Sequence, residues 1–99
     1  MDIVYVSLQR RDRGAVPPTE ASEVVGILWA HARPGDALQH VTARSQDDRV
    51  DLLLYLLTRR GADGPSDPVA SAHTLISRGH RASPLLSGRY HPPASPNTC

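Results

Sequence analysis

The chain has 99 residues and a mass of 10.7 kDa, which excludes a second folded domain of ordinary size. Residues 1–77 carry eight Arg against ten acidic residues, and residues 78–99 carry three Arg and no acid, so the main part of the chain lacks the basic surface typical of nucleic-acid-binding proteins. No apolar run approaches the roughly 18 residues that cross a bilayer, and a single cysteine, Cys99, excludes an intramolecular disulfide. We therefore expect a soluble cytoplasmic protein that neither enters a membrane nor binds nucleic acid.

The first half of the chain predicts strand, helix and strand. Residues 2–8 are rich in β-branched and aromatic residues, and the polar run 9–14 ends that pattern. Residues 19–32 place apolar side chains three and four positions apart, as on one face of a helix. Thr19 suits its N-terminal cap, and residues 33–35 suit its end. Residues 38–45 alternate in polarity, which predicts a half-buried strand.

Residues 50–57 form an apolar run that fits both a strand and a helix. As a strand, the run has Val50, Leu52, Leu54 and Leu56 on one face. As a helix, it groups Val50, Leu53, Leu54 and Leu57. We favour the strand because the polar turn 46–49 before it resembles a hairpin connection.

The second half predicts one more helix and a tail. Asp67 and Pro68 suit the cap and first position of a helix, and Gly79 suits its end. Residues 81–99 contain four prolines, two leucines and no acid, which predicts a largely flexible, basic tail. A fourth strand around residues 85–90 is an option.

The element order is thus β-α-β-β-α, with an optional final strand. Connection rules then favour an α+β, ferredoxin-like fold, with one sheet, the third strand between the first two, and two helices on one face. Residues 1–80 form the single domain, and residues 81–99 form the tail.

Two helices on one face leave the other face of the sheet uncovered. If residues 50–57 are extended, that face gathers large apolar and aromatic side chains, namely Ile3, Tyr5, Leu53, Tyr55 and Leu57. Contiguous apolar patches of this kind usually mark interaction sites. We predict that the face binds a second copy, a protein partner, or the chain's own tail through Leu85, Leu86 and Tyr90. A homodimer is the first choice because symmetric dimers are the commonest assembly.

Candidate chemistry is sparse. The five histidines lack the spacing of a metal site, so we expect no metal and no cofactor. Cys99 has no positioned base, and the catalytic residues of any reaction are unknown. His40 and His73 are the candidates to line a pocket between sheet and helices, with Tyr5 and Tyr55 as further polar groups. The residues therefore favour a non-catalytic accessory or interaction protein, with a small enzyme or small-molecule-binding protein as the alternative.

The alternative of a small enzyme or small-molecule-binding protein is based on a resemblance in the order of the elements. The segments are residues 33–35 closing a helix, a hairpin over residues 39–57, and residues 70–73 early in the second helix. In these three segments, residues 1–78 resemble the dimeric α+β barrel proteins typified by antibiotic-biosynthesis monooxygenases. The resemblance implies two sheets paired face to face. The chain departs from such enzymes at residues 56–58, where Leu-Leu-Thr replaces their acidic and aromatic residues.

Overall fold

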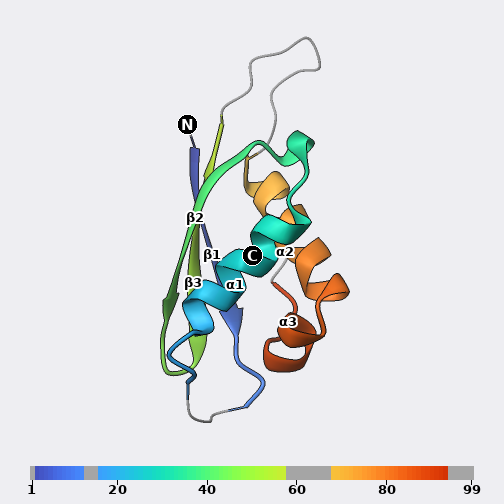
Figure 1. Cartoon of the computed structure of the whole chain (residues 1–99). Coiled ribbons are helices and arrows are strands. Elements are labelled where there is room, and N and C mark those ends of the chain that lie inside the picture. Colours follow the sequence, from blue (N-terminus) through green and yellow to red (C-terminus); the bar gives the residue numbers. More distant parts are fainter. Residues whose placement is uncertain (1, 13–15, 58–67, 94–99) are drawn as a thin grey trace.

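The computed structural model describes residues 2–12, 16–57 and 68–93, which form an antiparallel sheet with helices on one face (Figure 1). The elements are β1 (Asp2–Gln9), α1 (Glu20–His31), a short 3₁₀ helix (Pro34–Asp36), β2 (Leu38–Ser45), β3 (Arg49–Leu56), α2 (Pro68–Ala82) and α3 (Pro84–Arg89). The strand order is β1-β3-β2, and β3 runs antiparallel to both neighbours. The α+β class and the central position of the third strand are confirmed.

The ambiguous apolar run is a strand, so the helical alternative for residues 50–57 is wrong. The backbone N–H of Gln46 donates to the Arg49 carbonyl at 2.8 Å and closes the hairpin between β2 and β3. Val50, Leu52 and Leu54 are completely buried, whereas Leu53 keeps 36% of its surface exposed. Pairing on both sides satisfies the backbone of β3, and the two-residue period sends alternate side chains to opposite faces.

The core lies between the sheet and the helices. Its members are the inner side chains of all three strands together with the buried faces of the helices, including Val24, Leu28, Ala72, Leu75 and Ile76. Burying one such aliphatic side chain completely stabilises the fold by about 1.5–3 kcal/mol relative to leaving it in water. Helix α1 contacts mainly β2, and α2 contacts β1, so the two helices divide the inner face between them.

Helix α2 does not end at Gly79, and that prediction is wrong. The helix continues to Ala82, and Gly79 is buried within it. A Cβ atom at position 79 would lie 3.6 Å from Leu28 Cδ2 and 3.7 Å from Leu86 Cδ1. The glycine therefore lies where α1 and α3 contact α2, in a helix interior where glycine costs about 1 kcal/mol relative to alanine.

Residues 84–89 form a helix, so the optional fourth strand around residues 85–90 is wrong. Ser83 caps α3 by accepting a hydrogen bond from the Leu86 N–H at 3.4 Å, and Pro84 occupies the first helical position. After this helix, Tyr90 forms an isolated bridge to Arg10, the residue that follows β1. Leu86 and Tyr90 are completely buried in the same core, so ordered packing continues past residue 80. The predicted cap Asp67 and residues 94–99 lie outside the described residues.

Candidate functional site

The face of the sheet that points away from the helices is the candidate site. None of the described helices covers it (Figure 1). Strand pairing arranges its side chains in rows across β1, β3 and β2, namely Ile3–Tyr55–His40, Tyr5–Leu53–Thr42 and Ser7–Asp51–Arg44. We call this surface the outer face. Its rows change from apolar to polar along the strands.

One half of the outer face is apolar and exposed. Ile3 is 60% exposed and Tyr5 58%. Tyr55 is half-buried, and its ring packs against the ring of His40, with centroids 5.4 Å apart. Strand pairing thus places four of the predicted interface residues, Ile3, Tyr5, Leu53 and Tyr55, on one face. The fifth, Leu57, follows β3, is 50% exposed and lines a groove with Trp29 and Arg33.

The other half of the outer face is held by a hydrogen-bond network around Asp51. Its Oδ1 accepts from the Tyr5 hydroxyl at 2.7 Å, from the Ser7 hydroxyl at 2.9 Å and from Arg49 Nε at 2.9 Å. The bond from Tyr5, helped by those from Ser7 and Arg49, lowers the pKa of Asp51 below its ordinary value. Tyr5 therefore joins both halves, because its ring lies in the apolar half and its hydroxyl is fixed by the polar half.

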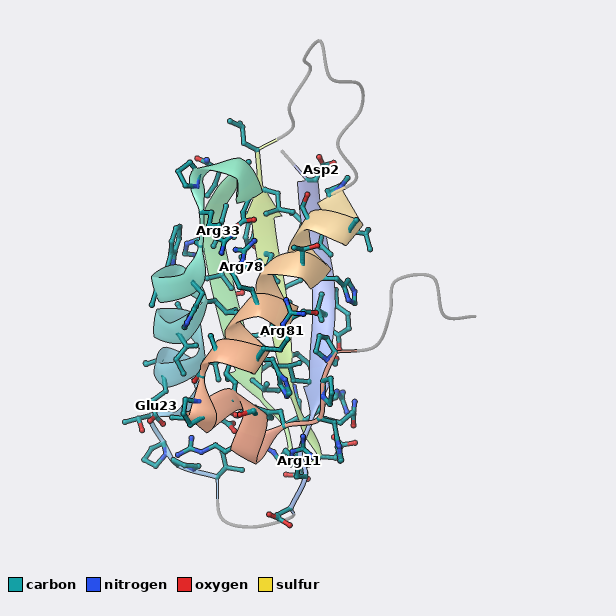
Figure 2. The ribbon with its side chains drawn as sticks, turned by 90° about the vertical axis from the view of Figure 1, so that its right-hand side faces the viewer. Asp2, Arg11, Glu23, Arg33, Arg78 and Arg81 are labelled. Carbon is teal, nitrogen blue, oxygen red and sulfur yellow. The ribbon has the colours of Figure 1, made fainter. Side chains whose placement is uncertain are left out.

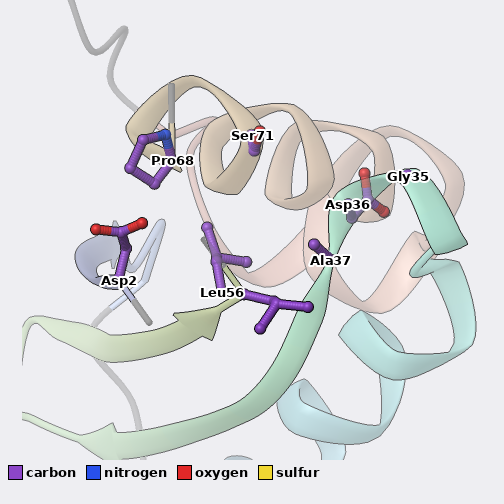
Figure 3. Close-up of a pocket in the computed structure, with 8 residues that line it drawn as sticks. Asp2, Gly35, Asp36, Ala37, Leu56, Pro68 and Ser71 are labelled. Carbon is purple, nitrogen blue, oxygen red and sulfur yellow. The ribbon is translucent and has the colours of Figure 1, made fainter. Parts of the chain in front are cut away.

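The two predicted pocket histidines are not brought together. His40 is exposed on the outer face, whereas His73 is half-buried on α2, on the opposite side of the sheet. A shallow groove of about 400 Å³ is lined by Trp29, Arg33, Leu57 and their neighbours. A smaller hollow of about 20 Å³ lies near Asp2 (Figure 3). Neither is lined by His40 or His73.

No group of three or more His, Cys, Asp or Glu side chains within residues 2–12, 16–57 and 68–93 is placed to hold a metal ion. Over the same ranges, no helix has the length and apolarity to cross a membrane.

A buried polar cluster of Arg10, Glu20 and Tyr90 lies outside the sites predicted from the sequence. Arg10 binds both carboxylate oxygens of Glu20, with Nη2 2.6 Å from Oε1, and the Tyr90 hydroxyl donates to Oε2 at 2.5 Å. Glu20 and Tyr90 are completely buried. Burial alone would raise the pKa of Glu20, but hydrogen bonds from Arg10, Ser45 and Tyr90 lower it to about 2.

This cluster joins distant parts of the chain. Arg10 also donates to the carbonyl of Gln46 at 2.9 Å and so reaches the turn between β2 and β3. The Arg11 N–H donates to the Arg89 carbonyl at 2.9 Å, and the His91 N–H donates to the Gln9 carbonyl at 2.9 Å. No local sequence pattern could reveal the cluster, because residues 10, 20 and 90 meet only in the folded chain. All three groups hold one another, so we assign the cluster a structural role.

A second ion pair fastens the loop before β2 to α2. Arg78 donates to both oxygens of Asp36, at 2.8 and 3.3 Å, and to the His31 carbonyl at 2.9 Å. Figure 2 shows Arg78 on α2, the helix that lies in front of the sheet in that view. Burial raises the pKa of Asp36, but the bonds from Arg78 and the Arg33 N–H outweigh it and lower the pKa.

Comparison of the chain with protein-family models, with curated proteins and with solved structures gave no match.

Proposed function

We propose that this protein is a small non-catalytic accessory or interaction domain that self-associates through the outer face of its sheet. The observation that carries the proposal is the exposure of Ile3, Tyr5 and Leu53 on a face that no described helix covers. The proposal includes a ferredoxin-like arrangement. It is supported by the order β1-β3-β2, by antiparallel pairing on both sides of β3, and by helices on one face.

Energetics support association through this face. Three large side chains, Ile3, Tyr5 and Leu53, keep between 36% and 60% of their surface exposed and lie together there. Their combined exposed area is of the order of 300 Å², the size of the largest apolar patch on a typical monomer, which often has a function. At about 25 cal/mol per Å², covering such an area stabilises a complex by several kcal/mol for each copy, before the entropy of association is subtracted.

The enzyme alternative receives no support from the geometry. His40 and His73 lie on opposite sides of the sheet, and the space between sheet and helices is filled by completely buried side chains. Asp51 and Glu20 already accept hydrogen bonds from neighbouring side chains. These two carboxylates are therefore engaged in holding the fold.

Molar mass in solution tests the proposal. We expect the full chain to move from 10.7 kDa towards twice that mass as its concentration rises in sedimentation equilibrium. Leu53→Glu places a charge in the apolar half and is expected to keep the chain monomeric. Val16→Glu is the matched control, because Val16 is 37% exposed against 36% for Leu53 but lies off the outer face, before α1. A wild-type chain that stays monomeric at every concentration contradicts the proposed function.

A further inference from the structure

We infer that the groove lined by Trp29, Arg33 and Leu57 is a binding site for a small aromatic carboxylic acid. The groove lies between the end of α1, the loop that follows it and the start of β2. Its volume of about 400 Å³ falls within the range of about 300–1,000 Å³ that is usual for small-molecule sites. The groove is separate from the outer face, because the side-chain rows of that face contain none of the described residues that line it.

One wall of the groove is apolar and exposed. Trp29, in the last turn of α1, is 43% exposed, and Leu57, directly after β3, is 50% exposed. Single exposed apolar side chains are ordinary on a protein surface, but these two line one concavity together with the half-buried Leu38. An indole ring packs well against a second aromatic ring. The apolar wall therefore favours a ligand that carries such a ring.

The charge of the groove comes from Arg33. This arginine is exposed on the loop between α1 and β2 (Figure 2), and it is the one charged residue among the described residues that line the groove. Within residues 2–12, 16–57 and 68–93, no carboxylate forms an ion pair with its guanidinium, since the nearby Asp36 binds Arg78. A guanidinium presents two parallel N–H donors that match the two oxygens of a carboxylate. A single cation beside an apolar wall thus suits a ligand with one carboxylate.

The loop that carries Arg33 is held in place from within the fold. The Arg33 N–H donates to Asp36 Oδ2 at 2.7 Å, and Arg78 holds the same carboxylate. Ala37, which also lines the groove, has a φ of 58° in the left-handed region that residues with a Cβ rarely adopt. Its carbonyl accepts the Leu57 N–H at 2.8 Å. Strained backbone of this kind occurs often at ligand sites, and a groove formed in advance loses little entropy when a ligand binds.

A β-bulge at the groove determines the kind of occupant. The register of β2 against β3 shifts between Leu38 and His40, so Gln39 is an extra residue without a partner on β3. A bulge disrupts the regular ladder, and bulges protect the edge of a sheet from pairing with another strand. The edge of β2 beside the groove is therefore poorly suited to an extended peptide, which favours a small molecule. The exposed Gln39 lines the groove, and its amide offers hydrogen bonds to a ligand.

Tryptophan fluorescence of the full chain tests this site, because Trp29 is the only tryptophan in the sequence. The probe is phenylacetate, which has an aromatic ring and one carboxylate. We expect a saturable change in fluorescence with a dissociation constant of about 1 mM, as befits a small ligand in an open groove. Phenylacetamide keeps the ring and lacks the charge, and acetate keeps the charge and lacks the ring. Each should bind at least about tenfold more weakly than phenylacetate.

Two matched variants assign the charge that binds the probe. Arg33→Gln should weaken phenylacetate binding by about tenfold, because the charge-assisted hydrogen bonds are lost. Arg81→Gln is the control, since Arg81 is also exposed but lies on α2, away from the groove, and this variant should bind like the wild type. Circular dichroism verifies that both variants fold. In NMR spectra of the wild type, the largest amide shifts on binding should fall at Ala37, Gln39 and Leu57.

Four results would overturn the site. They are the absence of a saturable change at concentrations well above the expected constant, equal binding of phenylacetate and phenylacetamide, equal binding by the folded variants Arg33→Gln and Arg81→Gln, and amide shifts that fall mainly outside the groove. None of these results bears on association through the outer face, which sedimentation measures separately.

Discussion

The substitution Glu20→Gln tests the buried cluster of Arg10, Glu20 and Tyr90. It removes the negative charge and keeps the size of the side chain. The pKa of Glu20 falls from an ordinary value of 4.5 to about 2 in the folded chain. At about 1.4 kcal/mol for each tenfold change in the proton equilibrium, ionised Glu20 contributes about 3 kcal/mol at neutral pH. This is a large share of the roughly 5–15 kcal/mol that stabilises a small domain.

The direction of the pH effect follows from the lowered pKa. The contribution of Glu20 is fully present above the unfolded value of 4.5 and is lost as the pH falls towards the folded value of about 2. Urea unfolding followed by circular dichroism at several pH values measures it. We expect the wild type to be about 3 kcal/mol more stable than Glu20→Gln at neutral pH, and the difference to shrink between about pH 5 and about pH 2.

Two further variants keep this test decisive. Glu23→Gln lies one helical turn away and removes a half-exposed ion pair to Arg89 at 3.3 Å, so it should cost less than about 1 kcal/mol. Tyr90→Phe removes only the hydroxyl that donates to Glu20 and should cost about 1–2 kcal/mol, which remains measurable if Glu20→Gln does not fold. Equal losses in Glu20→Gln and Glu23→Gln, or an unchanged pH dependence in Glu20→Gln, would refute the reasoning.

Three other substitutions probe the ion pair, the register of β3 and the packing of α2. Asp36→Asn leaves Arg78 without its anion and should lower the free energy of unfolding by about 3 kcal/mol at neutral pH. Because the pKa of Asp36 is lowered in the folded chain, this difference from the wild type should fade in acid. A difference that persists in acid contradicts the assignment of the ion pair. Leu54→Ala should lower the urea midpoint by the equivalent of about 2–5 kcal/mol, whereas Leu53→Ala in dilute protein should cost less than half as much, and the reverse order contradicts the register. Gly79→Ala should raise the free energy of unfolding by up to about 1 kcal/mol, because alanine has the higher helix propensity and its Cβ would meet neighbours at ordinary contact distances. A clear loss of stability would show that α1 and α3 cannot accommodate a methyl group there.

The sheet could be predicted because its signals are local. Alternation in residues 38–45 and the polar turn before residue 50 placed β2 and β3 within a residue of their observed bounds. The same alternation identified which side chains of β3 lie away from the helices. Periodicity reports burial directly, so the gathering of Ile3 and Leu53 on one surface could be anticipated before any tertiary contact was known.

The C-terminal part could not be predicted for the opposite reason. Its prolines and few apolar residues predicted too little buried apolar surface to offset the conformational entropy lost on folding, yet Leu86 and Tyr90 are completely buried. Tyr90 gains its place through Glu20 and Arg10, which are 70 and 80 positions away along the chain. Gly79 resembled a helix end because local propensity cannot register the close approach of Leu28 and Leu86. Contacts over such separations leave no periodic trace in the sequence.

The bond between Tyr90 and Glu20 also affects how the chain is made. A growing polypeptide that has reached position 80 contains β1, β2 and β3 but lacks the phenol that completes the environment of a buried carboxylate. A contact between residues 70 positions apart closes a long loop, and such non-local contacts slow folding. Native packing therefore cannot be completed during synthesis until Tyr90 has left the ribosome, and chains terminated before Tyr90 are expected to be targets for proteolysis.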